Sequence, residues 1–161
     1  MGFEVAALAA ERWGLPKAKK KFNGLITDGR AGPGGQRVAV LLPQTYMNDS
    51  GKAVGPARGA LGVEPDHVVV VHDEIDLPFG RIETRLGGGL AGHNGLKAVK
   101  TGLGTPDFRR VRVGVGRPDT TDPEIVSAHV LGRFSEPKEE VQALVERAAD
   151  ELDRVVSTLD E

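Results

Sequence analysis

Four consecutive valines, Val68–Val71, lie near the middle of the chain, with Pro65 before them and Pro78 after them. Such a run predicts a strand that is buried on both faces, in the middle of a parallel or mixed sheet. A histidine and three carboxylates follow at once, in the segment His72–Asp76. Because ligands bind beyond the carboxyl ends of the strands in α/β sheets, we expect these acids at a site. A solvated turn after a core strand is the alternative.

Hydrophobic periodicity predicts helices and strands along the rest of the chain. Strands are predicted at Phe22–Asp28, Gln36–Leu42, Arg81–Leu86 and Phe108–Gly116. Helices are predicted at Met1–Trp13, from about Asp49 to Ala60, from the glycine-rich segment to about Thr101, at Asp122–Val130 and after Ser135. The last helix has an apolar stripe opposite an acidic face, made of Val141, Leu144, Val145, Ala148, Leu152, Val155 and Val156.

Length and composition limit the class of protein. A chain of 161 residues suits one domain, and a hydrophobic content of 39% with a mean hydropathy of -0.24 is typical of a soluble protein. No apolar run approaches the roughly 20 residues that span a bilayer, and the first residues lack the pattern of a signal peptide. The absence of cysteine excludes disulfides and thiol chemistry and fits a cytoplasmic protein.

Charge is distributed unevenly. Residues 1–112 hold 16 Lys and Arg against 11 Asp and Glu, whereas residues 113–161 hold 5 against 12. A basic body is compatible with nucleic acid on one face. Arg110 and Arg112 share one face of their predicted strand, which suits phosphate, although an exposed salt-bridged face is the alternative. Lys17–Lys21 is better interpreted as a solvated linker than as a phosphate-facing surface.

Two further segments suggest ligand contacts. Gly87–Gly92 fits the spacing G-x-G-x-x-G, but it follows a half-polar strand late in the chain, which disfavours a dinucleotide site. Its glycines and the helix start still favour an anionic ligand, near His93 and Asn94. In the segment Gln44–Gly51, polar residues flank an exposed methionine before a helix, although an ordinary helix cap explains this segment alone.

Four blocks in the same order and spacing resemble bacterial peptidyl-tRNA hydrolase: Gln44–Gly51, His72–Pro78, Gly87–Leu96 and Arg110–Gly114. The resemblance extends from Phe3 to near the end of the chain. It implies an α/β fold in a single domain, residues 1–161, with a mixed twisted sheet flanked by helices. It also implies a cytoplasmic, cofactor-free monomer that hydrolyses the ester between peptide and tRNA in peptidyl-tRNA, with no membrane and no metal.

The resemblance assigns roles to individual residues. Asp73 corresponds to the acid that orients and stabilises a catalytic histidine. Tyr46, Asn48 and Asn94 correspond to substrate contacts, with Met47 and His93 as pocket walls. Arg85 and Arg112 correspond to positions that bind tRNA phosphate. A metal site at His72, Asp73 and Asp76 is a weaker alternative.

The sequence departs from the family at its beginning. The family's chains open with a strand, a Gly-Asn-Pro-Gly loop and an Arg-His-Asn segment that supplies the general base. Here Met1-Gly2-Phe3 aligns with the start of the first helix. We therefore expect the N-terminal central strand and the catalytic histidine to be missing, and the chain to be inactive and poorly stable. A misplaced start or a fragment is favoured over a non-catalytic RNA-binding relative.

Overall fold

The computed structural model describes residues 2–31, 36–43, 51–87, 94–116 and 137–159. Its helices are α1 (Gly2–Arg12), α2 (Gly51–Leu61), α3 (Asn94–Leu103) and α5 (Lys138–Thr158), with a 3-10 turn η2 at Pro65–His67. Its strands are β1 (Lys19–Lys21), β2 (Gly24–Arg30), β3 (Arg37–Pro43), β4 (Val69–Glu74), β5 (Ile82–Leu86) and β6 (Arg109–Gly114). The predicted α/β class is confirmed.

The described strands form two sheets of three strands. In the first, β1, β2 and β3 are antiparallel neighbours. In the second, β6 lies between β4 and β5, parallel to β4 and antiparallel to β5. The valine run was predicted in the middle of a sheet, but β4 is an edge strand among the described strands. This prediction was wrong because β6, distant in sequence, pairs with only one side of β4, and the valines of β4 are partly buried.

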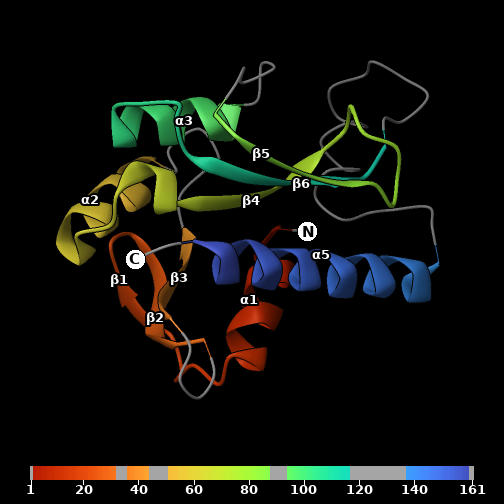
Figure 1. Ribbon diagram of the computed structural model, residues 1–161, viewed down its shortest axis with the longest axis horizontal. Coiled ribbons are helices and arrows are strands. Elements are labelled where there is room, and N and C mark those ends of the chain that lie inside the picture. The colour runs from red at the N-terminus through yellow and green to blue at the C-terminus, as the bar shows by residue number, and fades with distance from the viewer. Residues whose placement is uncertain (1, 32–35, 44–50, 88–93, 117–136, 160–161) are drawn as a thin grey trace.

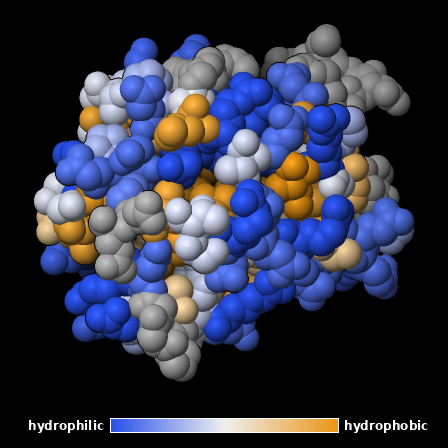
Figure 2. All heavy atoms as spheres, in the orientation of Figure 1, coloured by the Kyte–Doolittle hydropathy of each residue, from blue (hydrophilic) through white to orange (hydrophobic). Residues whose placement is uncertain are grey.

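Helices cover both faces of the β4–β6–β5 sheet (Figure 1). On one face, Val111 and Val113 of β6 share a core cluster with α1 and with Leu144 and Val145 of α5. On the other face, Leu96 and Val99 of α3 pack with Phe108 and with the partly buried Val68 and Val70. On the face that Figure 2 shows, hydrophilic side chains predominate and apolar side chains are visible between them. None of the described helices is long and apolar enough to cross a membrane.

The two terminal helices of the described chain pack on each other. The apolar stripe predicted for the last helix is confirmed, since Leu144, Val145, Ala148, Leu152 and Val155 are all buried. Polar contacts border this stripe. The indole Nε1 of Trp13 donates to Asp153 at 2.7 Å, and Arg12 pairs with Asp150 at 2.6 Å. These contacts fix α1, whose first residues lie beside β4.

Helices α2 and α3 approach each other through glycine. A Cβ at Gly102 would lie 2.6 Å from the carbonyl oxygen of Gly51, and one at Gly55 would lie 2.8 Å from the carbonyl oxygen of Gly102. These separations are too short for any side chain, so the two backbones are in direct contact. Helix α2 begins directly after residues 44–50, and α3 begins directly after residues 88–93. Both segments were predicted to contact a ligand, so the contact between the two helices fixes the points at which these segments end.

Several local predictions have definite outcomes. The hairpin of β2 and β3 is confirmed, with seven paired positions from Gly24↔Pro43 to Arg30↔Arg37. The interpretation of Lys17–Lys21 as a linker was wrong in part, because Lys19–Lys21 pairs with β2 as an exposed edge strand. Backbone pairing with β2 holds these lysines in a strand, which their polar sequence alone does not predict. The predicted helix Asp122–Val130 and the cap Ser135 lie outside the described residues.

Candidate functional site

The acids that follow the valine run belong to strand β4 itself. The acids were predicted to lie beyond the end of the strand, at a site or, as the alternative, in a solvated turn, but the strand continues through Glu74. Side chains alternate between the two faces of a strand, so adjacent acids point in opposite directions. Asp73 is paired in register with Val113, and His72 with Arg112. The carboxyl end of β4 therefore presents a different set of groups to each face of the sheet.

Asp73 faces the start of helix α1. Gly2 packs directly on the backbone of β4, where a Cβ at Gly2 would lie 2.5 Å from the carbonyl oxygen of Val71. Burial raises the pKa of the Asp73 carboxyl, and the negative charge of Glu4 raises it further. A hydrogen bond from the Gly2 backbone N–H opposes this shift in the pKa of Asp73. The result is a carboxyl held in place by a helix start, with its charged form disfavoured by burial.

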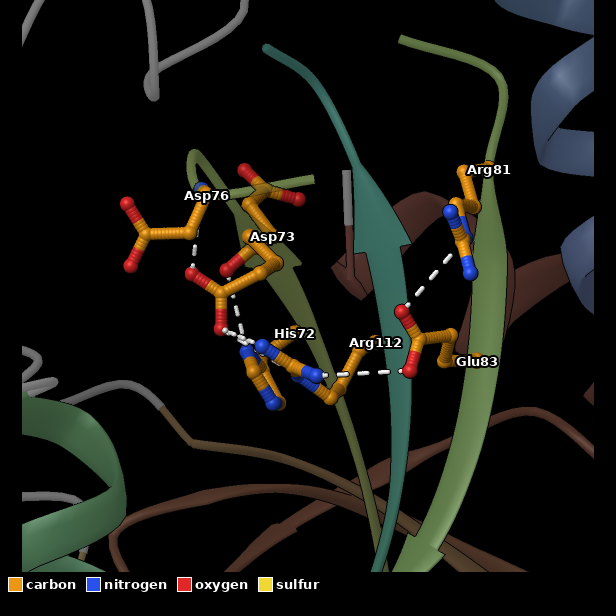
Figure 3. Close-up of polar contacts among 7 residues, drawn as sticks. His72, Asp73, Asp76, Arg81, Glu83 and Arg112 are labelled. Atoms are coloured by element: carbon orange, nitrogen blue, oxygen red, sulfur yellow. Dashed lines mark hydrogen bonds and ion pairs between the residues drawn. The ribbon is translucent and has the colours of Figure 1, made fainter. Parts of the chain in front are cut away.

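The opposite face carries a chain of alternating charges (Figure 3). Nη2 of Arg112 lies 2.9 Å from Oε1 of Glu74, and Nε of Arg112 lies 3.3 Å from the same oxygen. Nη1 of Arg112 is 3.6 Å from Oε1 of Glu83, whose Oε2 is 3.5 Å from Nε of Arg81. The Glu74 side chain is 7% exposed and that of Arg112 is 13% exposed. Glu74 also accepts from the backbone N–H of Asp76 at 3.3 Å, so it anchors both the arginine and the turn.

His72 belongs to this charged face and not to the Asp73 side. Its side chain is buried, and its Nδ1 lies 2.9 Å from the backbone carbonyl oxygen of Asp73. The ring and the Asp73 carboxylate lie on opposite faces of the strand, which prevents the two side chains from sharing a proton or a metal ion. Among the residues that the structure describes, no group of three or more His, Asp or Glu could hold a metal ion.

Arg110 lies inside the protein. It was predicted to share a phosphate-facing or exposed surface with Arg112, but it is only 1% exposed. Its guanidinium stacks 4.6 Å from the centre of the Phe108 ring, and its Nη2 donates to the carbonyl oxygen of Pro106 at 3.0 Å. Burial lowers the pKa of Arg110, as do the nearby charges of Arg85 and Arg112. The expectation of an exposed pair was wrong because Phe108 and the chain before β6 cover this arginine.

The structure describes only some of the predicted site residues. Tyr46, Met47, Asn48 and His93 lie outside the described residues, and Asn94 is the first residue of α3. The exposed Arg85 is opposite Arg110 in the sheet, so it shares a face with Arg112, away from Asp73. Their assigned roles remain predictions.

Sequence reasoning missed the importance of Glu74 and Glu83, because it gave Glu74 no role beyond membership of the acidic segment and gave Glu83 no role at all. A signal was present. Strand alternation places Glu74 on the face of His72, and Glu83 on that of Arg85. The pairing partner of each strand was needed to use this signal.

Together, these features define an α/β protein with a partly buried acid at the carboxyl end of a valine-rich strand and an arginine-rich face behind it. The model of the peptidyl-tRNA hydrolase family matches residues 1–161, and the chain belongs to that family. The resemblance inferred from the four sequence blocks is thereby confirmed.

Relatives agree with this assignment. A peptidyl-tRNA hydrolase of Mycobacterium sp. (strain KMS) is 46% identical over 159 residues, which are 98% of this chain and 81% of the relative. One from Syntrophotalea carbinolica is 48% identical over 135 residues, 84% of this chain and 69% of that protein. The crystal structure of peptidyl-tRNA hydrolase from Acinetobacter baumannii is similar with a TM-score of 0.80 and 34% identity, covering 96% of this chain and 77% of that one.

Proposed function

We propose that this protein hydrolyses the ester bond between peptide and tRNA in peptidyl-tRNA and releases free tRNA. Membership of the peptidyl-tRNA hydrolase family supports a hydrolase. The observation that carries the proposal is the position of Asp73. Its carboxylate is held at the carboxyl end of β4 against the start of α1, where an acid can orient a histidine.

The chemistry is direct attack of water on the ester carbonyl. A histidine removes the proton from the water, and Asp73 stabilises the imidazolium that forms. The electron pair of the attacking water forms the new C–O bond. The bond between the carbonyl carbon and the tRNA ribose oxygen then breaks, and that oxygen takes the proton from the imidazolium, which gives the released peptide acid and the free hydroxyl of the tRNA 3′ end. Amide donors such as Asn48 or Asn94 would stabilise the oxyanion that develops on the carbonyl.

We further propose that residues 1–161 alone do not catalyse this reaction. Of the histidines that the structure describes, His72 faces away from the Asp73 carboxylate, and His67 lies in η2, before β4 begins. The other two, His93 and His129, lie outside the described residues, and His93 is assigned to the pocket wall by resemblance. On this proposal, a further histidine, such as that of the family's Arg-His-Asn segment, has to supply the general base.

Binding of tRNA is assigned to the opposite sheet face. Arg85 and Arg112 would contact phosphate there, and Tyr46, Met47, Asn48, His93 and Asn94 would line the peptide and the 3′ end. The exposed position of Arg85 supports its assignment as a phosphate contact. For Arg112 to contact phosphate, its ion pair with Glu83 has to break. The protein is proposed to act as a monomer in the cytoplasm, without a bound cofactor. Light scattering during size-exclusion chromatography would test the monomer, and a dimer mass would contradict it.

The decisive experiment compares three forms of the protein with labelled peptidyl-tRNA. Residues 1–161 should bind the substrate without cleaving it. A form that carries a relative's strand, Gly-Asn-Pro-Gly loop and Arg-His-Asn segment ahead of Gly2 should release tRNA. In that form Asp73→Asn should reduce turnover by about 10²–10⁴-fold with unchanged tRNA binding, as expected when base catalysis is lost.

Each outcome separates one part of the proposal. Cleavage by residues 1–161 would contradict the claim that they lack a general base. An extended form that binds tRNA but never cleaves it would overturn the hydrolase proposal and favour an RNA-binding protein. Unchanged turnover in Asp73→Asn would remove Asp73 from the mechanism.

A further inference from the structure

Glu83 is an acid surrounded by arginines on the outer part of the β4–β6–β5 sheet. It lies directly opposite Arg112 in the sheet, and Arg85 is two residues further along the same face of β5. Arg81, immediately before the strand, contacts the Glu83 carboxylate from the other side. Figure 3 shows Glu83 between Arg81 and Arg112. One carboxylate thus contacts two arginines, Arg81 and Arg112, and Arg85 lies on the same face of its strand.

The contacts of Glu83 are the loosest in this network. Arg112 places both Nε and Nη2 within hydrogen-bond distance of Glu74, at 3.3 and 2.9 Å. By contrast, the Arg112–Glu83 and Arg81–Glu83 separations are 3.6 and 3.5 Å, at or beyond the limit of a hydrogen bond. The Glu83 side chain is 31% exposed, against 7% for Glu74. Glu83 can therefore leave Arg112 without disturbing the buried pair beneath it.

We propose that Glu83 is a built-in counter-anion that occupies the place of an RNA phosphate and gives way to it on binding. A phosphodiester carries the same single negative charge as a carboxylate and offers two acceptor oxygens to guanidinium groups. Glu74 holds Arg112 in position, so its Nη1 stays directed at the position that Glu83 vacates. This inference rests on the proposed function, because it takes the ligand to be tRNA.

The exchange makes Glu83 a specificity-determining residue. A weakly bound polyanion must displace the carboxylate before it reaches Arg112, so adventitious binding is reduced. The exchange also changes the salt dependence. When a protein cation neutralises a phosphate, counterions are released and the affinity falls with rising salt. Where the cation is already neutralised by Glu83, that position contributes less to this dependence.

The test measures binding of fluorescent deacylated tRNA to residues 1–161 at a series of salt concentrations. Glu83→Gln should bind about 3–10-fold more tightly at low salt, and log Kd against log salt should be steeper by about 0.7–0.9. The matched control is Glu151→Gln, with the same change in charge on helix α5. Glu151 contacts Thr84, on the other face of β5, and should change neither quantity by a comparable amount. Glu83→Asp, which keeps the charge, should retain the wild-type slope.

Thermal melts of all variants provide the check on folding. Equal affinity and slope in Glu83→Gln and Glu151→Gln would overturn the inference, as would weaker binding by a folded Glu83→Gln. If Glu83→Gln does not fold, the salt dependence of tRNA binding by Glu83→Asp decides. This variant keeps the negative charge, so a slope of log Kd against log salt that is steeper than wild type by about 0.7–0.9 would contradict the counter-anion role. A wild-type chain that binds no tRNA even at the lowest salt would instead contradict the proposed function, and the inference with it.

Discussion

The two faces of the β4–β6–β5 sheet accommodate charge in different ways. The face toward α1 and α5 is apolar, with Val111 and Val113 fully buried, and it holds Asp73 where burial disfavours the charged form. The other face carries arginine and glutamate that compensate each other, as in the pair of Arg112 and Glu74. A carboxyl whose charged form is disfavoured is suited to support proton transfer. Arginines and glutamates that neutralise each other are instead suited to bind a ligand and to hold side chains in position.

The largest effect on stability is expected where a buried charge on the arginine and glutamate face loses its partner. Glu74→Ala removes the closest partner of Arg112, which is only 13% exposed, and leaves that guanidinium poorly paired. Loss of one member of a buried pair is strongly destabilising, so the free energy of unfolding should fall by about 3 kcal/mol. Urea denaturation would measure this. The double variant Glu74→Met with Arg112→Leu should recover most of the loss, and a loss under about 1 kcal/mol in Glu74→Ala would contradict the assignment.

On the apolar face, the corresponding change is a simple loss of packing. Val113→Ala deletes buried methyl groups from the cluster formed with α1 and α5. We expect a decrease of about 2 kcal/mol in the free energy of unfolding, from the transfer of those groups and the cavity left behind. Val38→Ala on β3, where the side chain is only partly buried, is the control and should lose less. Equal losses would mean that the two sites are packed alike.

Asp73→Asn tests the disfavoured acid directly. Because burial raises the pKa of Asp73 above its ordinary value of 3.8, the folded state binds the proton more tightly than the unfolded chain does. This contribution of Asp73 to stability is therefore greatest at low pH and decreases as the pH rises through the raised pKa. Asn carries no charge, so the variant should be more stable than wild type near pH 7, with a difference that shrinks on acidification.

The measurement is urea denaturation of both proteins at a series of pH values from the ordinary pKa of 3.8 up to pH 7. Glu151→Gln is a suitable comparison. Hydrogen bonds from Arg154 and Thr84 lower the pKa of Glu151, so its difference from wild type should have the opposite sign. A less stable Asp73→Asn at pH 7 would show that the start of α1 stabilises the carboxylate more than burial disfavours it.

The elements predicted from sequence were those whose pattern depends only on local spacing. The stripe from Leu144 to Val155 has the helical period, and the valines of β6 have the strand period, so both identify their buried faces. The position of Asp73 was also predicted, although its place inside β4 was not. The four sequence blocks identified the family because agreement in their order and spacing is far more specific than a match of any single block.

Features that depend on which strands meet could not be predicted. The link between Glu74 and Arg112 exists only because β6 inserts next to β4, with β5 and α3 between them in the chain. Burial of Arg110 depends on Phe108 covering it, and the edge strand Lys19–Lys21 exists only through pairing with β2. In each case tertiary contact outweighs a local signal that indicates an exposed, solvated segment.

The smallest effect is expected at the exposed rim of the apolar face, where charge is compensated by solvent. Oγ1 of Thr84 donates to Oε1 of Glu151 at 2.9 Å, and Arg154 contacts the same carboxylate. Thr84→Ala removes one exposed hydrogen bond, so the free energy of unfolding should fall by about 0.5 kcal/mol or less. The pKa of Glu151, measured by NMR titration, should rise toward its ordinary value because one of the hydrogen bonds that lower it is lost. A loss of stability comparable to that of Val113→Ala would mean that this rim, like the centre of the sheet, depends on specific partners and not on solvent.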